Sequence, residues 1–107
     1  MADQSAKEGL IRFLDEKAFL PVLDAKLEDY PESKRHKLKH VKRATQNERQ
    51  RFRSYDSAQD VVTNFKRDLH SGAAAEVHRE LRDLNLPTIN DVRGEFEKLA
   101  GALGVEH

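Results

Sequence analysis

The sequence predicts an all-α fold, a compact bundle of about five helices in which one long basic helix covers about residues 32–55. Apolar residues recur at spacings of three and four along nearly the whole chain, as on the buried face of a helix. No run of β-branched residues alternates with polar residues, as a strand would require. Joints of about two to five residues separate the periodic segments and favour antiparallel neighbours.

Length and composition fit one folded helical domain over residues 1–107. Leu, Ile, Val and Phe make up 26 of the 107 residues, which is above the level at which high charge favours disorder. The N-terminus lacks the features of a signal peptide, and no apolar run approaches the roughly 20 residues that span a bilayer. With no cysteine in the chain, we expect a soluble cytoplasmic protein without disulfides.

The first helix is predicted to begin at Ser5 and to end before Pro21. Ser5 and Glu8 have the spacing of a capping box, whereas Pro21 lacks the N–H that the helical ladder needs. The expected buried face comprises Leu10, Phe13, Leu14 and Ala18. Pro21 then suits the first position of a short second helix, in which Leu23 and Leu27 would point inward.

The long basic helix follows Pro31, and its inward seam is apolar at both ends and polar in the middle. The seam comprises Leu38, Val41, Thr45, Glu48, Phe52 and Tyr55. We expect the helix to be anchored at its two ends and to touch the core only lightly. One alternative break is visible, because Thr45-Gln-Asn-Glu48 has the form of a capping box and could begin a new helix after Ala44.

Two helices are predicted to follow the basic helix. Ser57 is the expected N-cap of the first, and Ser71-Gly72 is the expected joint to the second. Asn85 suits the left-handed position that ends the second helix. The predicted apolar face of the first comprises Val61, Val62, Phe65 and Leu69, and that of the second comprises Ala73, Ala74, Val77, Leu81 and Leu84.

The last helix has the clearest start and stop signals of the chain. Thr88 and Asp91 have capping-box spacing, and Gly104 suits a helix stop that is followed by an apolar contact from Val105. The expected buried positions are Val92, Phe96, Leu99 and Leu103.

Charge is strongly segregated along the chain, although the formal net charge is zero. Residues 34–53 hold nine of the nineteen Lys and Arg residues against a single acid, Glu48, and so carry a net charge of +8. The segments before and after carry −4 each. Any hypothesis about partners therefore starts from the basic segment.

Six cations of this segment are predicted to form one positive stripe, provided that the helix is unbroken. These candidate partner-binding residues are Arg35, Lys39, Lys42, Arg43, Arg49 and Arg53. Such a row suits a line of phosphates and equally suits an acidic helix. It also fits a solvated helix face whose charge is balanced by acids on neighbouring helices, which is the usual state of a charge run.

No catalytic, cofactor or metal motif accompanies the stripe. His36 and His40 have the spacing of two metal ligands on a helix, but the cations around them oppose a bound metal ion. Acids that are close in sequence point to different helix faces, serines suit caps and turns, and the glycines form no phosphate-binding loop. We therefore expect neither enzymatic activity nor a cofactor. A membrane-surface role is disfavoured because the basic helix has few large apolar side chains.

The sequence thus favours a non-catalytic protein that uses its basic helix to bind an acidic protein partner or a second copy of itself. The alternative is non-specific nucleic-acid binding through the same residues, although zinc-finger spacing, a helix-turn-helix joint and stacking aromatics are missing from the sequence. Both hypotheses require a continuous helix whose cations face outward and are free of the chain's own carboxylates.

Overall fold

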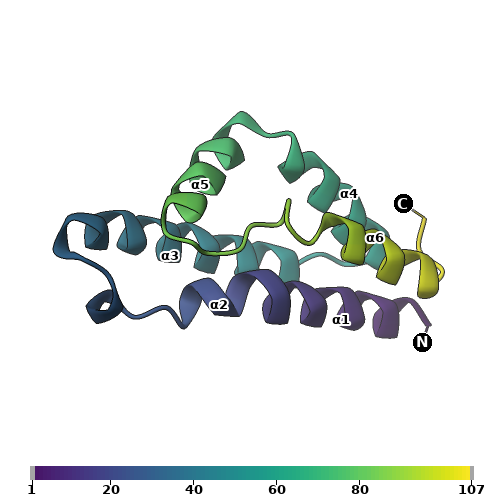
Figure 1. Ribbon diagram of the computed structural model, residues 1–107. Coiled ribbons are helices and arrows are strands. Elements are labelled where there is room, and N and C mark those ends of the chain that lie inside the picture. The colour runs from purple at the N-terminus through teal and green to yellow at the C-terminus, as the bar shows by residue number, and fades with distance from the viewer. Residues whose placement is uncertain (1, 107) are drawn as a thin grey trace.

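Helices make up all the regular secondary structure of the computed structural model, which describes residues 2–106 (Figure 1). The elements are α1 (Ala2–Leu14), a π-helical turn (Asp15–Phe19), α2 (Leu20–Leu23), a 3-10 turn (Leu27–Asp29), α3 (Glu32–Arg53), α4 (Ala58–Leu69), α5 (Gly72–Asp83) and α6 (Arg93–Ala102). The first three of these run on as one helix, so the described residues form five helical rods. The predicted all-α bundle is confirmed.

The long helix α3 lies in the middle of the bundle. It runs beside the rod formed by α1 and α2, and α5 packs against its other flank and forms a V with α4, which packs against α1 (Figure 1). The π-helical turn and α2 pack against α3, α5 packs against α3, and α4 and α6 pack against α1. The bundle measures 47 × 23 × 21 Å. Helix α3 therefore has neighbours along both of its flanks.

The start of the first helix differs from its prediction. The helix begins at Ala2, and Ser5 lies exposed within it rather than capping it. A tertiary contact accounts for the earlier start. The carboxylate of Asp3 accepts a hydrogen bond from the N–H of Ala58 (3.3 Å), and Ala6 in the next turn is buried in the core.

The same helix continues through Pro21, where the sequence predicted its end. Pro21 is the second residue of α2, and the π-helical turn before it widens the backbone at the point where its ring and missing N–H disturb the ladder. Leu20 keeps helical angles (φ −63°, ψ −38°) and donates its N–H to the carbonyl of Asp15. The wider turn changes the phase of the helix, and Val22 is buried in place of Leu23.

Helix α3 is unbroken through Thr45, so the alternative break does not occur. Its inward seam is as predicted, with Leu38, Val41, Thr45 and Phe52 buried. The expectation of light core contact is wrong, because Thr45 in the middle of the seam is only 4% exposed.

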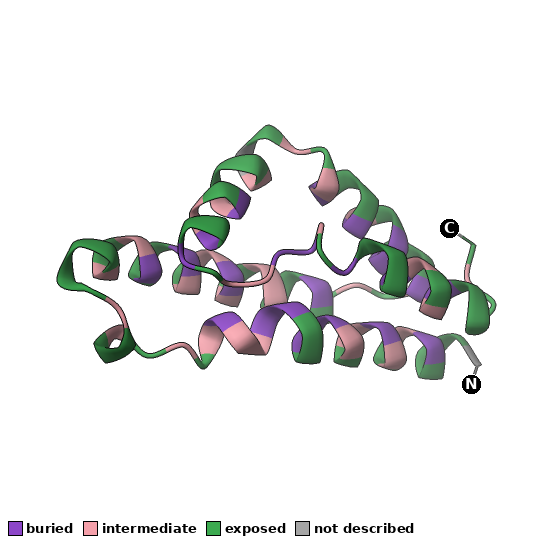
Figure 2. Cartoon of the chain, in the orientation of Figure 1, coloured by how far each residue is buried: buried purple, intermediate pink, exposed green. Residues whose placement is uncertain are grey.

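The core consists of two clusters, and α3 contributes to both. Phe52 belongs to the larger cluster, which lies mainly between α1, α4 and α6, where the rings of Phe65 and Phe96 stack at 3.9 Å. Leu38 and Val41 belong to the smaller cluster between α2, α3 and α5, against which Leu27 also packs. Buried positions follow the inner sides of the rods, as Figure 2 shows.

The helices after α3 confirm their predicted caps. Ser57 and Ser71 each precede a helix, and their hydroxyls accept hydrogen bonds from the N–H groups of Asp60 (3.1 Å) and Ala74 (3.5 Å). Asn85 ends the second of these helices with a φ of 59°. The predicted faces are buried, apart from Leu69 and Val77, which are partly exposed and pack against the core, and Ala74, which is also partly exposed. The side chain of Ala73 lies outside the described part of the chain.

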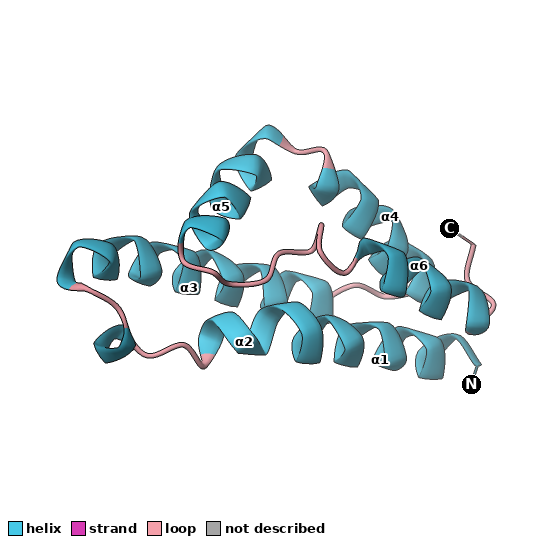
Figure 3. Cartoon of the chain, in the orientation of Figure 1, coloured by secondary structure: helices cyan, strands magenta, loops and turns pink. Residues whose placement is uncertain are grey.

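The last helix starts five residues later than predicted, at Arg93 rather than at Thr88. Residues 88–92 instead form successive turns with hydrogen bonds such as that from the N–H of Asp91 to the carbonyl of Thr88 (3.1 Å), and Figure 3 shows this stretch as loop. Only half of the predicted capping box forms. The carboxylate of Asp91 accepts a hydrogen bond from the N–H of Thr88 (2.9 Å), whereas the buried Thr88 hydroxyl has no partner among residues 2–106.

The end of the last helix confirms the glycine stop. Gly104 has a φ of 76°, and the N–H of Val105 donates to the carbonyl of Ala100 (2.9 Å), while Val105 packs against the larger cluster. The predicted burial of Leu103 is wrong, since this residue is 38% exposed. Val92 and Phe96 are buried as predicted, Leu99 is partly buried, and Ala100 is buried where the sequence predicted Leu103.

Candidate interaction surface on α3

The unbroken helix does place the six candidate residues on one side of α3, but it does not leave them all free. Four of the six contact other parts of the chain: Arg35, Lys42, Arg49 and Arg53. The other two, Lys39 and Arg43, are exposed. The predicted stripe is therefore divided into an internal flank and an outward face.

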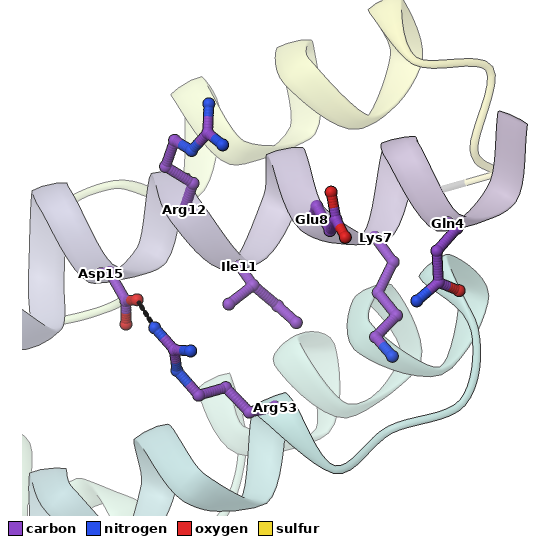
Figure 4. A pocket seen from close by; sticks show the side chains of 7 residues that line it. All are labelled: Gln4, Lys7, Glu8, Ile11, Arg12, Asp15 and Arg53. Atoms are coloured by element: carbon purple, nitrogen blue, oxygen red, sulfur yellow. Dashed lines mark hydrogen bonds and ion pairs between the residues drawn. The ribbon is translucent and has the colours of Figure 1, made fainter. Parts of the chain in front are cut away.

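Two arginines of the internal flank share one buried carboxylate. Asp15, the first residue of the π-helical turn, has a side chain that is only 8% exposed. Arg49 donates to it from Nε (2.9 Å) and Nη2 (3.4 Å), and Arg53 donates from Nη2 (2.6 Å). Figure 4 shows Arg53 reaching from α3 towards Asp15. Buried carboxylates are stable only with such partners, so these bonds fasten α3 to the N-terminal rod.

The other two internal residues bind backbone carbonyls between α2 and α3. The Nε of Arg35 donates to the carbonyls of Leu27 and Tyr30, each at 3.1 Å, and the ammonium of Lys42 donates to the carbonyl of Ala25. The carbonyls of Ala25 and Tyr30 lie on either side of the 3-10 turn, and that of Leu27 also accepts the N–H of Tyr30 within it (3.1 Å). The two cations thus stabilise the loop that turns the chain into α3.

The opposite flank of α3 makes a second set of contacts, which the predicted stripe did not include. The ammonium of Lys37 pairs with Asp83 (3.0 Å), and Nδ1 of His40 lies 2.8 Å from a carboxylate oxygen of Glu80, both on α5. Lys34 also donates to the carbonyl of Asp83 (3.3 Å). Seven of the nine cations of residues 34–53 therefore contact the protein itself.

Two acids and two arginines meet on this flank, because Asp68 of α4 contacts Arg51 and lies 3.9 Å from Arg67. Arg51 contacts Asp68 of α4 directly and lies 3.5 Å from Glu48. Burial, followed by the hydrogen bond and the negative charge of Asp68, raises the pKa of Glu48 from 4.5 to about 8, although Arg51 acts in the opposite direction. Glu48 therefore holds a proton at neutral pH. An acid on the inward seam was the signal in the sequence that a buried carboxyl pair was present.

His78 of α5 lies next to this group and is only 8% exposed. Burial lowers the pKa of His78 below its ordinary value of 6.5, and the positive charge of Arg82 acts in the same direction against Asp68 and Asp91. Its Nδ1 lies 3.0 Å from the amide nitrogen of Asn90, which fits a neutral ring that accepts a hydrogen bond.

The outward face of α3 carries the cations that are free to bind a partner. Neither Lys39 nor Arg43 makes a hydrogen bond or ion pair with any residue in the described chain, and both are exposed. The exposed residue His36 lies on the same side, within about 60° of both on a helical wheel. We name these three residues, His36, Lys39 and Arg43, the outer face of α3.

The structure gives no support to a metal site at His36 and His40. Among residues 2–106 there is no group of three His, Asp or Glu side chains placed to hold a metal ion. His40 pairs with Glu80 instead.

A pocket of about 400 Å³ lies beside the Asp15 pair (Figure 4). It is lined by Gln4, Lys7, Glu8, Ile11, Arg12, Asp15 and Arg53. Because cations and acids are mixed around it, its charge selects neither an anion nor a cation.

Comparisons with known proteins add no functional assignment. Protein-family models, curated proteins and solved structures were searched, and none of them matches the chain. No helix within residues 2–106 is long and apolar enough to cross a membrane.

Proposed function

We propose that the protein is a non-catalytic interaction module that binds an acidic segment of a partner protein through the outer face of α3. Lys39 and Arg43 would contact carboxylates of the partner, and His36 would add a hydrogen bond. This surface is smaller than the six-residue stripe that the sequence predicts.

One observation carries this proposal. Of the nine cations in residues 34–53, Lys39 and Arg43 are the two that lack a partner within the described chain, and they lie one helical turn apart. The other seven fix α3 against both of its flanks. A rigid helix that presents two adjacent exposed cations loses little conformational freedom when it binds a carboxylate-rich segment.

Nucleic-acid binding through the same helix is less well supported by this geometry. Six free cations would neutralise about six phosphates, but two free cations predict a logarithmic salt slope of only about −2. Such a slope corresponds to weak binding, and no aromatic side chain lies beside Lys39 and Arg43 in the sequence to stack on bases.

The proposal is tested by binding of a fluorescein-labelled peptide of alternating Glu and Ala residues, measured by fluorescence anisotropy at low salt. The double variant Lys39→Glu/Arg43→Glu should weaken binding about tenfold or more, because two attractive pairs become repulsive. The matched control is Arg79→Glu/Lys98→Glu, which reverses one Arg and one Lys that are exposed on α5 and α6.

Three results would overturn the proposal. An equal loss in both double variants would mean that only the net charge attracts the peptide. Tighter binding of a single-stranded oligonucleotide than of the peptide would favour nucleic acid. A dimer in sedimentation experiments that the Lys39→Glu/Arg43→Glu variant disrupts would indicate self-association through the same face.

A further inference from the structure

A small cavity lies at the boundary between the two clusters of the core. It is lined by Ala18, Phe19 and Ile89 of the larger cluster and by Val22 and Leu81 of the smaller one. No residue of the outer face of α3 lines it. Whatever this cavity holds is therefore independent of the proposed function.

The polar part of the lining comes from four side chains on three segments of the chain. Thr45 and Glu48 form the polar middle of the α3 seam, His78 lies on α5, and Thr88 lies in the turns before α6. Thr88, Thr45 and His78 are only 1%, 4% and 8% exposed. Polar groups that are removed from solvent in this way need hydrogen-bond partners within the protein or from a bound molecule.

The Thr88 hydroxyl is the group that points to a bound molecule. It is buried and has no hydrogen-bond partner among residues 2–106, whereas the N–H of the same residue donates to Asp91 (2.9 Å). A hydroxyl can donate one hydrogen bond and accept two. A molecule in the cavity that both donates and accepts hydrogen bonds would satisfy it.

The size and chemistry of the cavity limit what this molecule can be. Its volume of about 10 Å³ corresponds to one water-sized group and excludes an organic ligand. Glu48 supplies a single carboxyl group to the lining, which is fewer oxygen ligands than a bound metal ion takes from a protein. Cavities with apolar walls stay dry, but a cavity with several polar side chains can hold a water molecule that makes two to four hydrogen bonds.

We propose that one water molecule occupies this cavity and connects the Thr88 hydroxyl by hydrogen bonds to the polar side chains of α3 and α5. Thr45, Glu48 and His78 supply the remaining partners of the water. Nδ1 of His78 accepts from the amide of Asn90, so the neutral ring carries its proton on Nε2, which is then a donor.

This water accounts for two features of the sequence. The α3 seam is polar in its middle because Thr45 and Glu48 face a hydrated boundary between two apolar clusters. Thr88 does not cap the last helix with its hydroxyl, because the hydroxyl binds the water instead.

The first test is the stability of Thr88→Val, in which a methyl group replaces the hydroxyl in a side chain of nearly the same shape. A water that loses this partner destabilises the protein, so the equilibrium constant for folding should fall about fivefold in urea unfolding. A hydroxyl that simply lacks a partner predicts the opposite sign, since its apolar replacement is neutral or stabilising. An unchanged or raised folding constant would therefore overturn the proposal.

The matched control is Thr63→Val, the same chemical change at an exposed threonine of α4. It should alter the folding constant by no more than about twofold. A loss in the control as large as that in Thr88→Val would mean that the exchange of Thr for Val itself is destabilising, and the proposal would fail.

A crystal structure of the unaltered protein at a resolution that reveals ordered water locates the site directly. Electron density for one water is expected within about 2.6–3.2 Å of Oγ1 of Thr88 and of a polar atom of Thr45, Glu48 or His78. Absence of this density, or a direct hydrogen bond from the Thr88 hydroxyl to another protein atom, would overturn the proposal.

Discussion

Each flank of α3 brings like charges close together, and the two flanks differ in how the repulsion between these charges is reduced. On one flank, two arginines share a single buried carboxylate, Asp15, so this arginine-rich cluster has a surplus positive charge. On the other flank, the carboxyl groups of Glu48 and Asp68 lie against each other and both contact Arg51, while Arg67 lies 3.9 Å from Asp68. We call Glu48, Asp68 and Arg51 the acid-rich cluster and Asp15, Arg49 and Arg53 the arginine-rich cluster.

The two clusters reduce the repulsion between like charges in different ways, because their side chains differ in exposure to solvent. In the arginine-rich cluster the surplus lies on Arg53, whose side chain is 51% exposed and is therefore hydrated by solvent. In the acid-rich cluster the side chains of Glu48 and Asp68 are only 23% and 8% exposed, and a proton on Glu48 removes the repulsion between the two carboxyl groups. Of the two clusters, only the acid-rich one should make the stability of the protein depend on pH near neutrality.

The largest effect is expected for Asp15→Asn in the arginine-rich cluster. The change removes the shared carboxylate and leaves Arg49 and Arg53 without an ionised partner, which should lower the free energy of unfolding by about 2–4 kcal/mol. Urea unfolding followed by circular dichroism measures this value. The control is Glu16→Gln, an exposed acid in the same turn, which should change it by less than about 0.5 kcal/mol. Equal effects of the two variants would contradict the structural role of Asp15.

The acid-rich cluster should give a smaller, pH-dependent effect. Because the pKa of Glu48 is raised to about 8 in the folded state and is 4.5 otherwise, the folded state holds one proton more between these values, and stability falls as pH rises. We expect a loss of roughly 1–2 kcal/mol between pH 6 and 8, reduced by solvent screening of the partly exposed side chain.

This loss should be absent in Glu48→Gln, whose side chain is neutral throughout, and should persist in the control Glu76→Gln. The measurement is the urea midpoint at several pH values. Identical slopes in the wild type and in Glu48→Gln would refute the protonated state of Glu48.

His78 should also make the free energy of unfolding depend on pH, at the acid end of the range. Since its pKa is lowered in the folded state, the unfolded chain binds the proton more readily, and stability should fall as the pH drops below 6.5. The midpoint of the His78 imidazole in an NMR titration should lie below 6.5. A midpoint at or above 6.5 would contradict this environment.

The two arginines of the arginine-rich cluster should differ in a way that follows their exposure. Arg49→Gln should cost about 1 kcal/mol, because its side chain is 26% exposed and makes two hydrogen bonds. Arg53→Gln should cost about half as much, since solvent already hydrates it. Chemical denaturation of both variants under the same conditions measures the order, and the reverse order would contradict the comparison.

The smallest effect on stability is expected for the outer face of α3. Lys39→Glu/Arg43→Glu should change the free energy of unfolding by no more than about 0.5 kcal/mol, because neither residue contacts the described part of the chain. A thermal melt beside that of Arg49→Gln checks this. Severe destabilisation would show that these two cations also hold the bundle together.

The helical class and several helix ends were predictable because their signals are local. The apolar spacing of Leu10, Leu14 and Ala18 requires only a helix, and the caps at Ser57 and Ser71 involve residues three apart. The start at Ala2 and the late start at Arg93 depend on contacts and turns that short motifs do not encode.

The free part of the basic stripe could not be predicted, because pairing depends on distant residues. Asp15 lies 34 residues from Arg49 and 38 from Arg53, and nothing in the basic segment indicates which acid will approach it. The wheel placed Arg49 and Lys39 on one stripe, but it could not show that the edge of the stripe faces a neighbouring helix. Glu48 was different, because its seam position already placed an acid inside.

The π-helical turn lies where the N-terminal rod passes from one core cluster to the other, since Phe19 belongs to the larger cluster and Val22 to the smaller. One amino acid more or fewer in this turn would rotate everything after it by about 100°. Val22 would then leave its neighbours, and the chain would enter α3 from another direction. The number of residues between Leu14 and Pro21 is thus constrained more strictly than the identity of those residues. Natural variants of this protein should differ here by substitution but not by insertion or deletion.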